Sequence, residues 1–86
     1  MPSIGRVGVD SAGGKITTGN SSVEINGLPV AIVGSRIEGH GDSPHSSPSM
    51  NVGSPSVLVG GIGVCRTGDS ASCGHSLVSS SNVEAD

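Results

Sequence analysis

The stretch GNSSVEINGLPVAIVG, residues 19–34, alternates apolar with polar or small residues on both sides of Asn26-Gly27. An Asn-Gly pair between two such strands predicts a β-hairpin, because a type I′ turn needs positive φ at both central residues. The stretch GSPSVLVGGIGVCRTG, residues 53–68, repeats this pattern around Gly60-Gly61. We therefore expect two β-hairpins, and no helix of note, because no 3.6-residue apolar period extends beyond one turn.

The two hairpin sequences are copies of each other. Residues 19–34 align with residues 53–68 without a gap, and the identical pairs are Gly19/Gly53, Ser22/Ser56, Val23/Val57, Gly27/Gly61, Val30/Val64 and Gly34/Gly68. Chance similarity in a biased composition explains this less well, because the matches include both the turn and the alternation. The fold is therefore expected to contain an internal repeat.

A partial third copy involves the two ends of the chain. Residues 66–74 align with residues 6–14, and Val83-Glu84 aligns with Val23-Glu24. Two full copies and one partial copy predict a compact all-β repeat domain with approximate internal three-fold symmetry. Repeats of this kind bury their apolar faces against one another.

The chain is short and lacks large core side chains. It has 86 residues, 15 glycines and no Phe, Tyr or Trp, so we expect one domain over residues 1–86. The hairpins are expected to place Val23, Ile25, Val57 and Val59 in the interior. Such a core is thin, because aromatic side chains bury the most area. A small scaffold of this kind needs a further constraint, such as a disulfide, a metal ion or a partner surface.

Charge and hydropathy disfavour several classes of function. The formal net charge is −3, and the basic residues Arg6, Lys15, Arg36 and Arg66 form no cluster, so we expect no nucleic-acid partner. No apolar run approaches the roughly 20 residues of a membrane span. The N-terminus lacks the pattern of a signal peptide, so synthesis in a cytoplasm is expected. There, free or metal-bound cysteines are favoured over the alternative, a Cys65–Cys73 disulfide.

Five side chains are of the type that binds zinc: His40, His45, Cys65, Cys73 and His75. Four of them lie in the segments that follow the two hairpins, and Cys65 lies on a hairpin strand. The set of three histidines and one cysteine fits tetrahedral Zn²⁺, and a filled four-ligand shell is typical of a structural site. The alternative is that these histidines are solvated loop residues, since their spacing matches no common zinc-finger pattern.

The spacing of the four candidates permits one shared ion. Cys73 and His75 are two residues apart and would point to the same face of an extended chain. His40 and His45 can converge only if the chain reverses direction between them. Residues suited to such a turn are present: Gly41, Asp42 and Pro44.

The remaining polar residues do not indicate an enzyme. Asp10, Asp42 and Asp69 occur with many serines, but there is no nucleophile elbow, and the chain is too short to build a pocket and a triad. Asp69 follows Gly68 and is expected to cap backbone amides in a turn. Cys65 aligns with Ala31, which predicts a small buried residue, because a free cysteine behaves as a small hydrophobe.

Two longer stretches resemble the PAAR-repeat proteins, the spike-tip proteins of contractile injection machines. They are ITTGNSSVEINGLPVAIVGS (residues 16–35) and NVGSPSVLVGGIGVCRTGDSASCGH (residues 51–75), and the resemblance runs from about Ile4 to Val83. GSPSVLVGG and RTGDSASCGH are its most specific parts. The Pro-Ala-Ala-Arg signature is degraded to Pro29-Val30-Ala31-Ile32 and to Gly63-Val64-Cys65-Arg66. Ala12 stands about where many members have an early histidine.

The resemblance implies a fold, a cofactor and a partner. The fold is a small cone of β-hairpins, and its apex is held by one structural Zn²⁺ bound to His40, His45, Cys73 and His75. Its base would sit on the blunt end of a trimeric β-helical spike, of the valine-glycine repeat or phage central-spike type. One tip chain would bind each trimer.

The resemblance also implies a mechanical function. The protein would be a structural tip that caps and sharpens the spike, helps to pierce the target cell envelope and contacts the target membrane transiently, without a small-molecule substrate. It would be made in the cytoplasm and assembled at the tip of a phage tail baseplate, within the virion, or of a type VI secretion spike. The alternative is a free-standing structural zinc-binding module attached to no spike, which the internal hairpin repeat disfavours.

Overall fold

The fold consists of two short β-hairpins connected by long irregular segments. A computed structural model describes residues 2–42 and 45–85, and within these ranges it contains no helix. Strands β1 (Asn20–Ile25) and β2 (Leu28–Val30) form one antiparallel pair, and β3 (Leu58–Val59) and β4 (Ile62–Gly63) form the other. The all-β prediction and both predicted hairpins are confirmed. In the described part of the chain, no helical segment has the length and apolar character to cross a membrane.

Both hairpins turn at the predicted residue pairs. Asn26 and Gly27 have φ values of 55° and 81°, and Gly60 and Gly61 have φ values of 60° and 82°. Positive φ at both central positions is the backbone conformation that a type I′ turn requires. Asn and Gly adopt it at low cost, so the turn residues explain why the chain reverses at these points.

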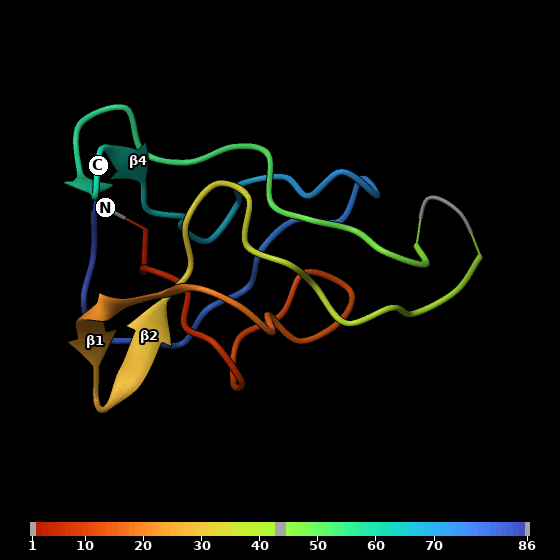
Figure 1. Cartoon of the computed structure of the whole chain (residues 1–86), viewed down its shortest axis with the longest axis horizontal. Coiled ribbons are helices and arrows are strands. Elements are labelled where there is room, and N and C mark those ends of the chain that lie inside the picture. Colours follow the sequence, from red (N-terminus) through yellow and green to blue (C-terminus); the bar gives the residue numbers. More distant parts are fainter. Residues whose placement is uncertain (1, 43–44, 86) are drawn as a thin grey trace.

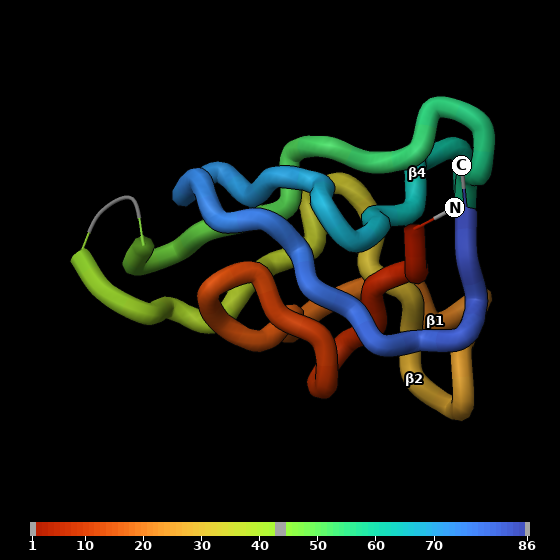
Figure 2. The backbone as a smooth tube through the Cα atoms, turned by 180° about the vertical axis from the view of Figure 1, so that it is seen from behind, coloured from red at the N-terminus to blue at the C-terminus, as the bar shows by residue number. Residues whose placement is uncertain are grey.

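The molecule narrows from one end to the other, with overall dimensions of 32 × 24 × 21 Å. Both hairpins and both chain termini lie at the broad end, which we call the base (Figure 1). Residues 38–42 and 45–48 lie at the opposite, narrow end, which we call the apex. The tube view from behind shows the two termini side by side at the base (Figure 2).

The chain ends complete the base by pairing with each other. Ser3 and Glu84 form an antiparallel bridge, and the Ile4 amide donates a hydrogen bond of 2.8 Å to the Val83 carbonyl. Val83 and Glu84 are the residues that the repeat aligns with Val23 and Glu24 of the first hairpin. The partial third copy therefore forms an antiparallel pair like that of a hairpin, except that the two segments are the ends of the chain and no turn connects them.

Three backbone segments, residues 4–6, 30–32 and 64–66, pair with one another in a closed cycle. The bridges are Arg6 with Val30, Ile32 with Val64, and Arg66 with Ile4. Each segment thus uses one end to contact the next segment and the other end to contact the previous one. The approximate three-fold symmetry of the whole domain stays a prediction, and this cycle is the feature that supports it most directly.

The centre of this cycle is built from Gly5, Ala31 and Cys65. The Gly5 amide donates to the Cys65 carbonyl, the Cys65 amide to the Ala31 carbonyl, and the Ala31 amide to the Gly5 carbonyl, each at 2.9 Å. We call these three bonds the backbone ring. Only small residues permit this approach: a Cβ atom at Gly5 would lie 2.6 Å from Cδ2 of Leu77. The expectation that Cys65 is a small buried residue equivalent to Ala31 is confirmed, since both are 0% exposed.

The core consists of two groups of small and aliphatic side chains. One contains Ala12, Ile16, Ala31, Ile37, Met50, Cys65, Ala71 and Leu77. The other contains Ile4, Ile25, Val30, Val59, Val64 and Ala85. Because the second group draws on both hairpins and both chain ends, it joins the three parts of the base.

The hairpin strands bury fewer valines than their alternation predicts. Ile25 and Val59 are buried as expected, but Val23 and Val57 are 43% and 37% exposed, so the expectation for these two is wrong. A register shift inside β1 disturbs the alternation of its side chains, which places Val23 on the outside. Val57 precedes β3 and lies outside the regular ladder.

Candidate metal centre

Three loops extend from the backbone ring toward the apex (Figure 1). The first, second and third apical loops are residues 11–15, residues 36–49, of which 36–42 and 45–49 are described, and residues 70–76. A backbone hydrogen bond closes each loop at its foot: Ile16 amide to Asp10 carbonyl (3.0 Å), Met50 amide to Ser35 carbonyl (2.8 Å) and Leu77 amide to Asp69 carbonyl (2.8 Å). The loops have five, fourteen and seven residues. The second loop is therefore the one with enough chain to reverse direction over the apex.

A side chain caps the turn before each loop. The bonds are Arg6 amide to Asp10 Oδ2 (2.8 Å), Ile32 amide to Ser35 Oγ (2.9 Å) and Arg66 amide to Asp69 Oδ2 (2.7 Å). The expected capping role of Asp69 is thus confirmed. Both aspartates also pair with the arginine of the same turn, at 2.9 Å for Asp10 and 2.8 Å for Asp69. These turns fix where each apical loop starts.

The second apical loop brings His40 and His45 together by folding back on itself. The His40 amide donates to the His45 carbonyl at 2.9 Å, and the His45 amide donates to the Asp42 carbonyl at 2.7 Å. The predicted chain reversal between the two histidines is confirmed. Of the turn residues expected from the sequence, Pro44 lies outside the described residues.

The third apical loop presents Cys73 and His75 by a different geometry from the one expected. The segment is not extended: the Gly74 amide donates to the Ala71 carbonyl at 3.0 Å, and the Ala71 amide donates to the His75 carbonyl at 2.8 Å. Cys73 therefore lies in a turn, and Gly74 follows it with a φ of 92°. The turn still directs the side chains of Cys73 and His75 to the same place, as the extended geometry was expected to do.

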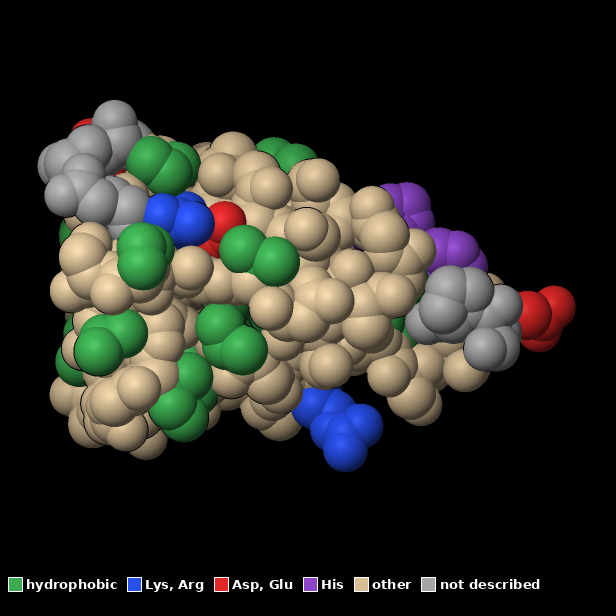
Figure 3. Space-filling model, turned by 90° about the horizontal axis from the view of Figure 1, so that it is seen from above, with side chains coloured by type: hydrophobic (Ala, Val, Ile, Leu, Met, Phe, Trp, Pro, Cys, Tyr) green, Lys and Arg blue, Asp and Glu red, His purple; other side chains and the backbone are tan. Residues whose placement is uncertain are grey.

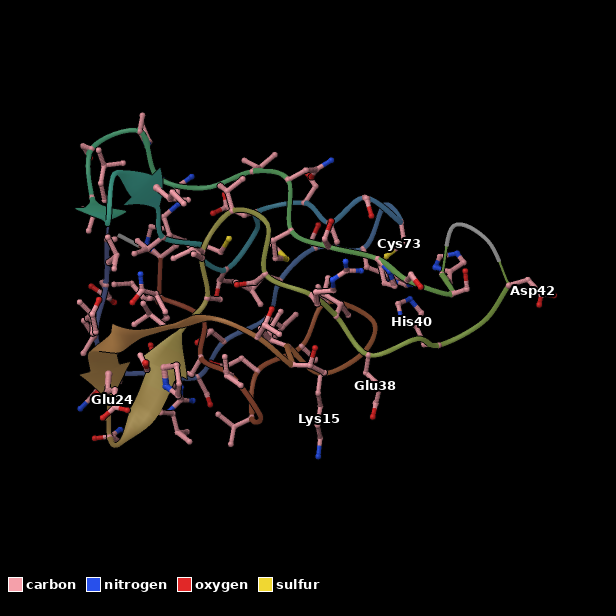
Figure 4. All side chains as sticks on the ribbon, in the orientation of Figure 1. Lys15, Glu24, Glu38, His40, Asp42 and Cys73 are labelled. Atoms are coloured by element: carbon pink, nitrogen blue, oxygen red, sulfur yellow. The ribbon has the colours of Figure 1, made fainter. Side chains whose placement is uncertain are left out.

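The four predicted ligands form one cluster at the apex. One potential ligand atom from each of His40, His45, Cys73 and His75 lies within 4.8 Å of the others. Nε2 of His40 is 3.0 Å from Nδ1 of His45 and 3.7 Å from Sγ of Cys73. Histidine side chains are visible at the narrow end of the surface (Figure 3), and His40 and Cys73 lie on neighbouring loops there (Figure 4).

The proton on His40 can be placed from its hydrogen bonds. Nδ1 of His40 lies 3.0 Å from the Glu38 carbonyl oxygen, which can only accept a hydrogen bond. Nδ1 therefore carries a proton and donates it to this carbonyl, and Nε2 is the ring nitrogen that faces the cluster, 3.0 Å from Nδ1 of His45. A metal-binding histidine commonly has its second nitrogen fixed in this way.

This donor set could hold a metal ion. Two imidazole nitrogens lie 3.0 Å apart with a thiol beside them, and three of the four residues are half-buried while His75 is exposed. Imidazole and thiolate ligands suit Zn²⁺ and other borderline or soft ions rather than Mg²⁺ or Ca²⁺. The chemistry of the cluster therefore fits the ion that the sequence predicts.

The first apical loop contributes no side chain to the cluster. Ala12 is 0% exposed and packs in the core, so the place where the resemblance suggested a histidine is filled by an interior methyl group. The cluster therefore draws its ligands from the second and third loops only.

Cys65 is separate from the cluster. Both cysteines are free thiols, and Sγ of Cys65 donates a hydrogen bond of 3.3 Å to the Val52 carbonyl. Burial, together with the negative charge of Asp69, raises the pKa of the Cys65 thiol to about 12. Such a thiol stays protonated, so it is a poor metal ligand and a poor nucleophile.

Sequence reasoning missed one contributor to the site, the Glu38 carbonyl that orients His40. No sequence signal could have found it, because every residue has a carbonyl group, and its role here depends on the path of the loop.

The family described as PAAR motif matches residues 9–79, which include all three apical loops and both hairpins. No curated protein matches the chain.

Proposed function

The chain belongs to the PAAR-motif family, and from this premise we propose that it caps the central spike of a contractile injection machine. The family is associated with the spike-tip proteins of such machines. The proposed partner is a trimeric β-helical spike, with one tip chain for each trimer. The observation that carries the proposal is the family match over residues 9–79, in a molecule with an apolar broad end and a ligand cluster at its narrow end.

We propose that the ion at the apex is one structural Zn²⁺ held by His40, His45, Cys73 and His75. Zinc bonds of about 2.0–2.1 Å to nitrogen and 2.3 Å to sulfur give tetrahedral ligand-to-ligand distances of roughly 3.3–3.6 Å. The observed 3.0 Å and 3.7 Å distances from Nε2 of His40 lie on either side of this range. When bound, the ion would hold the second and third apical loops together. The protein would orient the four donor side chains toward it.

The base supplies the proposed docking surface. Five large hydrophobic side chains on or next to its paired strands are exposed: Val23 43%, Val57 37%, Leu58 53%, Ile62 42% and Val83 42%. Val23, Val57 and Val83 occupy corresponding positions in the three copies of the repeat. Exposed apolar groups at three related positions suit contact with the end of a trimer, because each subunit could meet one of them.

The apex supplies the proposed mechanical part. It is narrow because half of the residues in the three apical loops are Gly or Ser and the rest include no aromatic side chain of Phe, Tyr or Trp. A metal can hold converging loops where too few apolar side chains are present to form a core. We propose that the tip concentrates the force of contraction on a small area of the target envelope and contacts the membrane only transiently. No turnover chemistry is part of this proposal.

The proposal is tested by co-purification with the trimeric spike of the same machine, either a phage tail or a type VI secretion system. We expect one zinc per chain by elemental analysis and a complex of one chain per spike trimer by multi-angle light scattering. Leu58→Asp should weaken the complex. Val9→Asp is the matched control, because Val9 is 54% exposed but lies in a turn outside the hairpins.

Two outcomes would count against the proposal. A chain that contains zinc but elutes apart from the spike would favour the alternative, a free-standing zinc-binding module. A freshly purified chain that contains no zinc would overturn the metal assignment.

A further inference from the structure

The first apical loop contacts the cluster of candidate ligands through the backbone of glycine residues, which carry no side chain. Gly13 has a φ of +87°, and a Cβ atom there would lie 2.5 Å from Cδ2 of His75 and 2.8 Å from Nε2 of His40. No real Cβ atom tolerates such distances, so the two imidazole rings occupy the space that a side chain at position 13 would fill. His40 and His75 come from different loops, and Gly13 is the place against which both rings rest.

Gly14 likewise leaves no room for a side chain, here beside the Glu38 carbonyl, which orients His40. A Cβ atom at Gly14 would lie 2.4 Å from the Glu38 carbonyl oxygen and 3.0 Å from Nδ1 of His40. This carbonyl is the acceptor that fixes the proton on His40. The Glu38 amide also donates to the Lys15 carbonyl at 2.8 Å, so the second loop is fastened to the first beside this contact.

We infer that Gly13-Gly14 is a positioning element of the metal centre: because these residues have no side chain, their backbone packs against the imidazole rings and sets the positions of His40 and His75. This inference rests on the proposed metal binding. It assigns a role to the first apical loop, which supplies no ligand. In the metal-free chain the imidazole rings can rotate away from an added methyl group. The absence of a side chain at Gly13 should therefore affect chiefly the metal-bound state, in which the ion fixes the positions of the rings.

Gly13→Ala tests this role against a matched control. Gly8 has a φ of +88°, and a Cβ atom there would meet no atom within 4 Å. Gly8→Ala therefore carries the same backbone strain without the steric contact. Zn²⁺ affinity is measured by competition with a chromogenic chelator, and thermal stability is measured with EDTA present.

We expect Gly13→Ala to bind Zn²⁺ at least about tenfold more weakly than Gly8→Ala, which is the lower end of the loss seen when groups that orient metal ligands are removed. The two variants should melt at the same temperature in EDTA. The visible absorption of bound Co²⁺ should also be altered in Gly13→Ala alone, because the ligand geometry changes.

The outcomes separate the inference from the proposed function. If the unmodified chain binds no Zn²⁺, the metal assignment fails, and the inference fails with it. If the unmodified chain and Gly8→Ala bind Zn²⁺ and Gly13→Ala binds it equally well, the inference alone is overturned. A lower melting temperature of Gly13→Ala than of Gly8→Ala in EDTA would also overturn it, because the glycine would then serve the fold rather than the ion.

Discussion

The backbone ring and the apex are organised in opposite ways. The ring joins Gly5, Ala31 and Cys65 through main-chain hydrogen bonds of equal length, and its side chains serve only by being small. The apex joins the second and third apical loops through side chains, three of them half-buried and one exposed. The side chains of the ring therefore matter for their small volume, whereas those of the apex matter for the nitrogen and sulfur atoms that they bring together.

This difference affects how each region depends on a ligand. The ring satisfies its own donors and acceptors, so its hydrogen bonds need nothing from outside the chain. The cluster instead gathers four potential ligand atoms within 4.8 Å of one another, with Nε2 of His40 3.0 Å from Nδ1 of His45. Such an arrangement gains most when a cation lies between the donors. We therefore expect the two regions to respond very differently when the metal is removed.

The largest effect is expected from Cys73→Ser. The change should weaken Zn²⁺ binding strongly and lower the free energy of unfolding in zinc by roughly 4 kcal/mol or more, a part of the ~10 kcal/mol that structural zinc contributes in small domains. Calorimetry with and without EDTA measures the loss, and EDTA treatment of the unmodified chain should reproduce it.

Hydrogen exchange on the EDTA-treated chain sharpens the comparison. The amides of Gly5, Ala31 and Cys65 should stay protected, whereas those of His40 and His45 should exchange faster. Equal loss of protection in both regions would contradict the distinction drawn between ring and apex.

Much of this organisation could be predicted from the sequence. Asn26-Gly27 and its repeat at Gly60-Gly61 located both turns, because the φ requirement of a type I′ turn is local. The correspondence of Cys65 with Ala31 predicted that Cys65 would be buried. The four candidate ligands could be chosen because Cys65 is the only other His or Cys in the sequence.

Other features depend on contacts between distant residues and could not be predicted. The exposure of Val23 follows from a register shift, which simple alternation cannot detect. The role of Gly13 is defined by His40 and His75, which approach it from other loops. Cys73 was expected on an extended segment, but it lies in a turn closed by hydrogen bonds within residues 71–75. The Ser72 amide also fastens this turn to the second apical loop by donating to the Ser49 carbonyl at 2.8 Å.

An intermediate effect is expected at the capped turn before the first apical loop. Burial of Asp10 opposes its ionisation, but hydrogen bonds from Arg6 and Ser79, at 2.9 Å each, together with the charge of Arg6, outweigh burial and lower the pKa of Asp10. A lowered folded-state pKa stabilises the fold at pH values above the unfolded pKa, which is near 3.9. This contribution is lost as the pH falls through the folded pKa.

Asp10→Asn should therefore cost about 2 kcal/mol at pH 7, in the range for hydrogen bonds to charged groups. The cost should shrink as the pH falls below about 4, because the carboxylate of the unfolded chain takes up a proton there, whereas the folded carboxylate does so only at lower pH. Urea unfolding in EDTA over this pH range measures the difference without a contribution from metal release. Asp42→Asn is the control, because Asp42 is exposed at the apex (Figure 4), and its change should cost little at any pH. A cost for Asp10→Asn that is independent of pH would show that the carboxylate charge is not its source.

The smallest effect is expected from Cys65→Ala, the counterpart at the ring of Cys73→Ser at the apex. Ala31 already occupies the equivalent position, so alanine at 65 keeps the backbone ring and removes only a sulfur atom and its bond to the Val52 carbonyl. The loss should be about 1 kcal/mol, within the range for small core truncations, and Zn²⁺ affinity should not change.

Thiol labelling gives an independent measure of the same difference. With its pKa raised to about 12 by burial, Cys65 has almost no thiolate at pH 8 and should resist iodoacetamide in the folded chain. Mass spectrometry should therefore find no label in zinc, one label at Cys73 in EDTA and two labels after denaturation. If Cys65→Ala and Cys73→Ser proved equally mild, the metal assignment would be wrong. If Cys65 reacted as fast as Cys73 in EDTA, the ring would have opened with the apex, and its hydrogen bonds would depend on the ion after all.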